Sequence, residues 1–347
     1  MTGVRNRGET IRKFIVNNVE AHTNDIVALT AKEFGISRQA VNVHIKRLVQ
    51  QKSITAEGTT RTKSYHLHPF VVDAKSFELS GLEEDRVWRD FVSPNLGSLP
   101  DNIIDIWNYG STEMLNNAID HSQGRNVIVS VKKNPVFSEI IITDDGLGIF
   151  TRIQKLLNLN DERHAVLELS KGKLTTDPAN HTGEGIFFSS RMFDEYAILS
   201  GGIYFSHEYN KPENWIMERN KPNSGTTVFM KMANNSVRKI KSVFDEYASE
   251  SDYGFDKTVV PVSLARYGNE RLVSRSQAKR LLARIDRFKI VILDFEGIDQ
   301  IGQAFADEVF RVFNNKYPEV QLYFIKAQPG VEDMIVRALS SRVDSEI

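Results

Sequence analysis

Cysteine is absent from this chain of 347 residues. Without cysteine there is no disulfide bond, no thiolate metal site and no cysteine nucleophile. The eight histidines are scattered and lack the paired spacing of a zinc site. No stretch approaches the roughly 18 consecutive apolar residues that a transmembrane helix needs. The first ten residues contain no apolar core of a signal peptide. We therefore expect a cytoplasmic protein with no membrane partner.

Length and composition predict a globular protein of two or three domains. The chain is 41% hydrophobic and 26% charged, which is ordinary for such proteins. The net charge of −1 conceals an asymmetry. Residues 1–66 hold eleven Lys and Arg against five Asp and Glu, a net charge of +6, which leaves −7 on the remainder. A basic segment joined to an acidic body indicates a polyanionic partner at that end.

The basic segment has the pattern of three helices followed by two short strands. In the third helix, apolar residues recur at helical spacing on one face, and polar and basic residues fall mostly on another. Ser37 is well suited to cap the start of that helix. We expect helices over residues 9–19, 24–34 and 38–49, and strands over residues 53–58 and 61–67.

Residues 1–68 resemble a winged helix-turn-helix domain of the bacterial repressor kind. The resemblance implies that the third helix lies in the major groove of double-stranded DNA, with the wing beside it. Arginine, glutamine and asparagine can read base edges, whereas lysine and arginine also meet phosphates. The alternative is a winged helix used only for protein contacts. The candidate DNA contacts are Arg38, Gln39, Asn42, Lys46 and Arg47 on the helix, and Arg61 and Lys63 on the wing.

Four short motifs between residues 113 and 227 carry chemistry. Glu113 and Asn117 share one face of an expected helix, where a carboxylate can activate water and an amide oxygen can bind Mg²⁺. Asp144 follows an expected strand over residues 136–143 and could accept a hydrogen bond from an amine such as that of adenine. Glycines after Asp144 and before an expected helix at 186–193 allow close backbone approach and phosphate binding. Each motif alone is also typical of a turn or a solvated helix face.

In this order the motifs resemble the GHKL superfamily of ATP-binding domains, which includes gyrase, heat-shock chaperones, mismatch-repair ATPases, and histidine and anti-sigma-factor kinases. The resemblance covers roughly residues 80–235 and implies an α/β sandwich (the Bergerat fold) with ATP and Mg²⁺. It implies Glu113 as the general base, Asn117 as the Mg²⁺ ligand and Asp144 as the adenine contact. The other implied nucleotide contacts are Asp120, Gly146, Gly148, Lys171, Lys173, Gly183, Gly185, Thr226 and Thr227.

Two features of this central segment leave alternatives open. Lys171 and Lys173 fall where the family has its lid, around residues 151–182, and a solvated loop explains them equally well. The glycine motif at Gly183 and Gly185 is shorter than the family often has. We expect an ordered connector over residues 69–98 and the ATP-binding domain over residues 99–250.

The third segment alternates strands and helices, which is typical of a small α/β domain. The stretch from Asp294 to Glu308 resembles STAS-like domains, relatives of anti-sigma-factor antagonists, and sets a domain over residues 255–342. In such regulators a serine at the helix start after this strand accepts a phosphate. Here Gly302, Gln303 and Ala304 carry no hydroxyl, and we interpret Ser274 as a helix cap.

These segments predict an α+β multidomain protein with a winged helix, a GHKL α/β sandwich and a small STAS-like α/β domain. The first functional hypothesis is an ATP-binding, slowly hydrolysing, DNA-binding transcriptional regulator, with a homodimer as the expected state. One alternative is a serine/threonine protein kinase of the anti-sigma-factor type, acting on a partner or on its own STAS-like domain. Another is a chaperone-like or defence-associated ATPase clamp. The STAS-like domain is expected to bind a protein partner.

Overall fold

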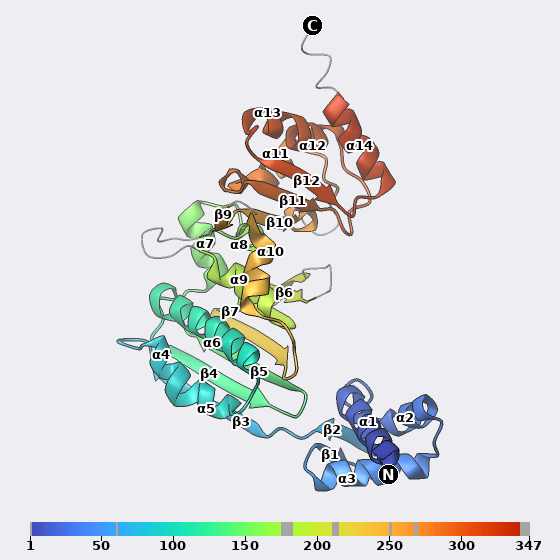
Figure 1. Ribbon diagram of the computed structural model, residues 1–347. Helices are drawn as coiled ribbons and strands as arrows, with labels where there is room; N and C mark the ends of the chain where they lie inside the picture. Colours follow the sequence, from blue (N-terminus) through green and yellow to red (C-terminus); the bar gives the residue numbers. More distant parts are fainter. Residues whose placement is uncertain are drawn as a thin grey trace.

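The computed structural model describes residues 2–59, 62–174, 183–209, 215–249, 252–266 and 270–340. The fold is mixed α/β with several separate sheets, arranged in three bodies that follow one another along the chain (Figure 1). A helical N-terminal body and a C-terminal body with a parallel sheet lie on either side of a larger central sheet. In the part of the chain that the structure describes, no helix is both long enough and apolar enough to cross a membrane.

The N-terminal body consists of three helices and a two-stranded antiparallel hairpin. The third helix begins where predicted, because the Ser37 hydroxyl accepts the backbone N–H of Ala40 at 3.2 Å. The first helix begins at Thr2, earlier than the predicted residue 9. A separate hydrophobic core, including Ile15 and Val41, holds the elements together. The elements are α1 (Thr2–Asn18), α2 (Ile26–Phe34), α3 (Arg38–Gln50), β1 (Ile54–Glu57) and β2 (Ser64–Leu67).

A five-stranded antiparallel sheet in the order β3-β4-β5-β7-β6 forms the centre of the molecule. Alternate residues such as Val127, Val129 and Val131 are fully buried on one face, while Ile128 between them is 47% exposed. This period of two places one face of the sheet against helices. The strands are β3 (Val71–Glu78), β4 (Asn126–Lys133), β5 (Phe137–Asp144), β6 (Glu195–Glu208) and β7 (Trp215–Ala233).

The segment 69–98, which the sequence suggested as a connector, contributes the edge strand β3 to this sheet. β3 pairs along its whole length with β4, so the central body begins near residue 71 rather than at 99. Two short helices follow, α4 (Glu84–Val87), which continues into η1 (Trp88–Val92), and α5 (Ser93–Leu96).

The helices on the buried face position the later site. The longest, α6 (Asp101–Asn116), buries Ile106 and Trp107 and ends in a π-helical turn, η2 (Asn117–His121). The others are α7 (Ile149–Leu157), α8 (Glu162–Lys171), α9 (Gly185–Met192) and α10 (Ile240–Tyr247), followed by the short hairpin β8 (Ala248–Ser249) and β9 (Asp252–Phe255).

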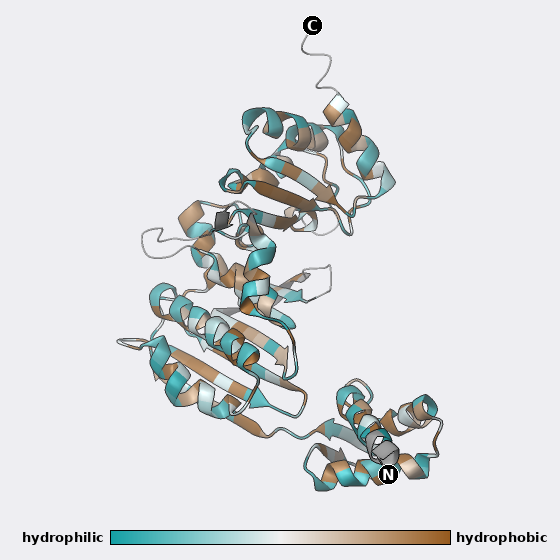
Figure 2. Ribbon diagram, viewed as in Figure 1, coloured by the Kyte–Doolittle hydropathy of each residue, from teal (hydrophilic) through white to brown (hydrophobic). Residues whose placement is uncertain are grey.

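The C-terminal body is built on a parallel sheet in the order β10-β11-β12. Its central strand is almost uniformly hydrophobic (Figure 2), as expected for a strand buried on both faces. Ser274 caps α11 in a reciprocal arrangement with Gln277, which confirms its interpretation as a cap. The elements are β10 (Lys257–Pro261), η3 (Val262–Ala265), α11 (Arg275–Leu282), η4 (Ile285–Arg287), β11 (Ile290–Asp294), α12 (Gln303–Asp307), η5 (Glu308–Phe313), α13 (Asn314–Lys316), β12 (Gln321–Ile325) and α14 (Pro329–Ser340).

Candidate functional site

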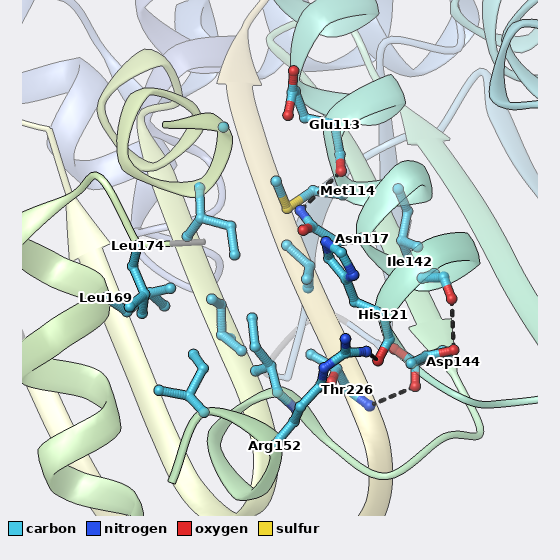
Figure 3. Close-up of a pocket in the computed structure, with 18 of the residues that line it drawn as sticks. Glu113, Met114, Asn117, His121, Ile142, Asp144, Arg152, Leu169, Leu174 and Thr226 are labelled. Atoms are coloured by element: carbon cyan, nitrogen blue, oxygen red, sulfur yellow. Dashed lines mark hydrogen bonds between the residues drawn. The ribbon is translucent and has the colours of Figure 1, made fainter. Parts of the chain in front are cut away.

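A cavity of about 280 Å³ lies between the sheet and the helices of the central body (Figure 3). Most of its wall is aliphatic, with Leu169 and Leu174 on one side and Ile142 on the other. A few polar groups converge on it from separate elements: Glu113 and Asn117 from the α6–η2 helix, Asp144 from the end of β5, and others from α7 and β7. An apolar cavity with a few convergent polar groups is the usual form of a small-molecule site.

The Asp144 carboxylate lies at one end of this cavity and is only 7% exposed. Its Oδ1 accepts backbone N–H groups from Gly146 at 2.9 Å and Thr226 at 3.2 Å. Burial raises the pKa of Asp144 above its ordinary value, although these hydrogen bonds oppose the rise. The backbone donors therefore hold a buried carboxylate in one orientation at the end of β5, where an amine-bearing ligand could meet it.

Glu113 and Asn117 lie one helical turn apart and both line the cavity. The Asn117 side-chain nitrogen donates to the Glu113 carbonyl at 2.9 Å, which leaves the Asn117 Oδ1 as the atom that can bind a ligand. The Glu113 carboxylate lies against the first residue of α9, since a β-carbon at Gly185 would collide with its Oε2. Gly185 therefore leaves room for the Glu113 carboxylate in this position.

These oxygens fit a magnesium ion carried by a phosphate ligand. Mg²⁺ takes oxygen ligands and is commonly held by one or two protein groups together with substrate phosphates and water. The Asn117 Oδ1 would be one such ligand, and the Glu113 carboxylate lies on the same helix face. Among the described residues, no group of three His, Asp or Glu side chains could hold a metal without such help.

The other predicted nucleotide contacts divide into those at the cavity and those beside it. Gly183, Gly185 and Thr226 line it. The Thr227 hydroxyl pairs instead with that of Thr143, at 3.1 Å. The residues that do not line the cavity are Asp120, which is exposed, and Gly146 and Gly148, which form the turn after β5. Residues 175–182 of the expected lid lie outside the described residues.

Lys171 and Lys173 do not point into the cavity, which corrects their interpretation as phosphate contacts. Lys171 is 1% exposed, and its ammonium donates to the carbonyls of Arg280 and Ala283, at 3.2 and 2.9 Å. The Lys173 ammonium donates to the carbonyl of Arg287 at 3.1 Å. Both lysines are thus engaged with the C-terminal body, and we remove them from the candidate phosphate ligands.

Arg152, which the sequence did not single out, lines the cavity beside His121, a residue within the predicted nucleotide motif. Arg152 lies on α7, and its guanidinium donates to the backbone carbonyl of His121 (Figure 3). This contact brings the start of α7 onto the end of η2. The position of Arg152 in the first turn of α7, four residues after Gly148, is the local signal that could have drawn attention to it.

The predicted DNA-binding residues lie mostly on the outer surface of the N-terminal body. Val41, Ile45 and Leu48 of α3 are buried, and the polar face of the helix points away from the core. Val43, 66% exposed, lies on that outer face. Arg61 lies outside the described residues. Among the described candidates, Asn42 has a half-buried side chain. The exposed side chains are those of Arg38, Gln39, Lys46, Arg47 and Lys63.

Comparison with protein families identifies one part of the chain. Residues 277–332 match the family of the STAS-like domain of unknown function (DUF4325). The match begins in α11 and ends in α14, so the C-terminal body contains a STAS-like domain, as predicted. No curated protein matches the chain significantly.

Proposed function

We propose that this protein is an ATP-binding, slowly ATP-hydrolysing transcriptional regulator with a GHKL-type central domain and a winged-helix DNA-binding domain. The observation that carries the proposal is the buried Asp144 carboxylate, fixed by two backbone amides at the end of a cavity that also holds Glu113 and Asn117. The carboxylate at one end of the cavity can accept the amine of an adenine base. The oxygen ligands at the other end suit a metal ion bound to the phosphates of the same nucleotide.

Each polar residue has a part in this proposal. Asp144 accepts the exocyclic amine of adenine, and the aliphatic walls enclose the ring. Asn117 holds Mg²⁺, which would neutralise phosphate charge when bound. Glu113 orients water and takes its proton as a general base. Gly183 and Gly185 offer backbone N–H groups at the start of α9, where the helix dipole favours a phosphate.

The surface of α3 supports the DNA-binding part of the proposal. A row of exposed basic and amide side chains lies opposite the buried face of this helix. Arg38 and Gln39 near its start suit base edges, and Lys46 and Arg47 suit phosphates. Binding of a palindromic site as a homodimer is part of the proposal, and sedimentation of the protein with and without duplex measures it.

Protein kinase activity is the second candidate, because the STAS-like domain lies in direct contact with a helix that lines the cavity. The same structure disfavours transfer to its own domain at two positions. The Ser274 hydroxyl is engaged in capping α11, and the helix start at Gly302 has no hydroxyl. Phosphate from γ-labelled ATP that appears on protein rather than in solution would favour the kinase.

Two measurements on the full chain test the proposal. Calorimetry measures the binding of ATP in the presence of Mg²⁺, and phosphate release measures its turnover. Asp144→Asn should abolish detectable binding, and Glu113→Gln should abolish turnover while binding remains. Asp145→Asn is the matched control, because this neighbouring carboxylate does not line the cavity and accepts from Arg125 and Asn126. Wild-type protein that binds no adenine nucleotide, or Asp144→Asn protein that binds as well as wild type, would overturn the assignment.

A further inference from the structure

The C-terminal end of α8 lies between the cavity and the STAS-like domain. α8 packs against β10 and η3 (Figure 1), and the Thr258 hydroxyl on β10 donates to the Lys171 carbonyl at 2.7 Å. Phe187, which lines the cavity from α9, packs against Phe255, with ring centroids 4.5 Å apart. One short segment of chain therefore contacts both the candidate site and the neighbouring domain.

A buried cluster of charged side chains joins α8 to the STAS-like domain. Glu168, 2% exposed, accepts the Lys171 ammonium at 2.8 Å and the Arg284 Nε at 3.0 Å. His164 Nε2 lies 3.4 Å from the same carboxylate. Glu168 and Lys171 belong to α8, whereas Arg284 belongs to the STAS-like domain. We call Glu168, Lys171 and Arg284 the interdomain ion cluster.

Lys171 also completes the end of a helix in the other domain. The carbonyls of Arg280 and Ala283, which accept its ammonium, lie at the C-terminal end of α11. Carbonyls there have no partner within the helix and carry the negative end of its dipole. A lysine ammonium donates hydrogen bonds to these carbonyls, and its positive charge interacts favourably with the negative end of the dipole. Separation of the domains would leave these carbonyls and the Glu168 carboxylate to find other partners.

Within residues 169–174, some side chains point to the cavity and others to the STAS-like domain. Leu169 and Leu174 line the cavity, whereas Lys171 and Lys173 between them bind the STAS-like domain. Figure 3 shows both leucines across the cavity from Asn117 and Asp144. Gly172 lies between the lysines with a φ of +81°, and a β-carbon there would collide with Phe255. Any displacement of the leucines therefore moves the residues that hold the other domain.

The cavity is small for a nucleotide. Its volume of about 280 Å³ lies at the lower limit of the usual range of about 300–1,000 Å³ for ligand sites, so a nucleotide would press on its walls. The opposite walls are the central strands β5 and β7 and the long helix α6, which packs through the fully buried Trp107. The wall formed by Leu169 and Leu174 is the one whose other side contacts a separate domain, so a shift of this wall changes the contacts with that domain.

We propose that occupancy of the cavity and docking of the STAS-like domain oppose each other through the interdomain ion cluster. This inference rests on the proposed nucleotide site. A nucleotide that presses Leu169 and Leu174 towards the STAS-like domain displaces Lys171 from its acceptors at the end of α11 and disrupts the contact between α8 and that domain. By reciprocity, docking weakens nucleotide binding by the same factor by which nucleotide weakens docking, so variants that loosen docking should bind nucleotide more tightly.

The test compares a fluorescent ATP analogue bound to the full chain of wild type, Lys171→Met and Arg284→Gln. Arg284 is less buried than Lys171, so Arg284→Gln is less disruptive to folding. It tests the same cluster if Lys171→Met does not fold. Lys279→Met is the matched control, because this lysine lies on α11 with a side chain 70% exposed. Both cluster variants should bind about five-fold or more tightly than wild type, within the roughly 5–150-fold range of such couplings. The control should bind as wild type does.

Hydrogen exchange supplies the reciprocal measurement. Nucleotide added to wild type should speed amide exchange in residues 257–261 and 280–284, and it should have little effect in Lys171→Met. Equal affinities in wild type and variants with unchanged exchange would overturn the coupling and leave the nucleotide site intact. No binding in wild type or any variant would overturn the proposed function and the coupling together. Binding in the cluster variants alone would support the coupling.

Discussion

The Asp144 carboxylate accepts the backbone N–H of Thr226 at 3.2 Å, across 82 residues of sequence. The Thr226 hydroxyl in turn accepts the N–H of Ile149 at 3.0 Å. One threonine of β7 thus connects the end of β5 with the start of α7, the two elements on either side of the glycine turn. The position of Asp144 in the cavity depends on this connection as much as on its own strand.

We predict that Thr226→Val lowers the free energy of unfolding by about 1–3 kcal/mol. The change removes the acceptor of a backbone N–H in a buried place, and an unsatisfied buried donor costs that much. Urea unfolding of the full chain measures it. Thr227→Val is the control, since its half-buried hydroxyl pairs with another hydroxyl and its loss should cost about 0.5–1.5 kcal/mol. Equal losses in the two variants would contradict this role for Thr226.

Gly185→Ala should impair the site more than its small size suggests. The added β-carbon would meet the Glu113 carboxylate, so α9 or the glutamate must shift. Because the clash is with the end of a flexible side chain, we expect little loss of stability, and ATP turnover lowered at least about tenfold by displacement of the Glu113 carboxylate. Gly330→Ala in α14 provides the comparison, because its nearest neighbour would be an ordinary 3.8 Å away. If Gly185→Ala turns over ATP as fast as wild type, this position of the Glu113 carboxylate is not required.

The ion cluster predicts a specific response to acid. Burial alone would raise the pKa of Glu168, but the hydrogen bond from His164 and the charges of Lys171 and Arg284 outweigh it and lower the pKa to about 2. Because the folded pKa lies below the ordinary 4.5, the stabilisation is complete above pH 4.5 and is lost as the pH falls towards 2.

Glu168→Gln isolates this contribution. Removing one partner of a buried ion pair typically costs about 3–5 kcal/mol, so the variant should be less stable than wild type at pH 6. The difference in unfolding free energy should shrink between pH 4.5 and pH 3, where wild type loses its own contribution. Urea unfolding at several pH values measures both. A difference that stays constant with pH would show that the carboxylate charge is not responsible.

DNA binding, if present, should depend on salt through Lys46. Each phosphate contact contributes about 0.9 to the slope of log affinity against log salt concentration, so Lys46→Ala should reduce that slope by about 1 for all duplex sequences. Lys241→Ala on α10 removes the same charge from an exposed position on the central body and should leave the slope unchanged. Identical slopes for wild type and Lys46→Ala would place the phosphate contacts elsewhere.

Local features of the fold were predictable from the sequence, because they depend on neighbours in the chain. Ser37 and Ser274 cap the helices that their sequences suggested. The strand ending at Asp144 was indicated by an apolar run over residues 136–143 that leads into a glycine turn. Such features are set by hydrogen bonds and periodicity within a few positions.

The errors concern residues whose partners are remote. Lys171 was interpreted as a loop lysine or phosphate contact, yet its acceptors lie 109 and 112 residues later, at the end of α11. Residues 71–78 gave no sign of the partner strand β4, because an edge strand with mostly exposed side chains lacks a strong alternation. No local pattern reports a partner that only the tertiary fold brings near.

One strand connects the two candidate binding surfaces. At one end of β5, Val136 and Phe137 pack against the core of the N-terminal body, and at the other lies Asp144. Eight residues at about 3.4 Å each make this strand about 27 Å long, and hydrogen bonds to β4 and β7 keep it straight. Tilting such a rod by only about 4° would displace its far end by roughly 2 Å. The strand therefore runs from the pocket to the core of the N-terminal body without passing through the STAS-like domain.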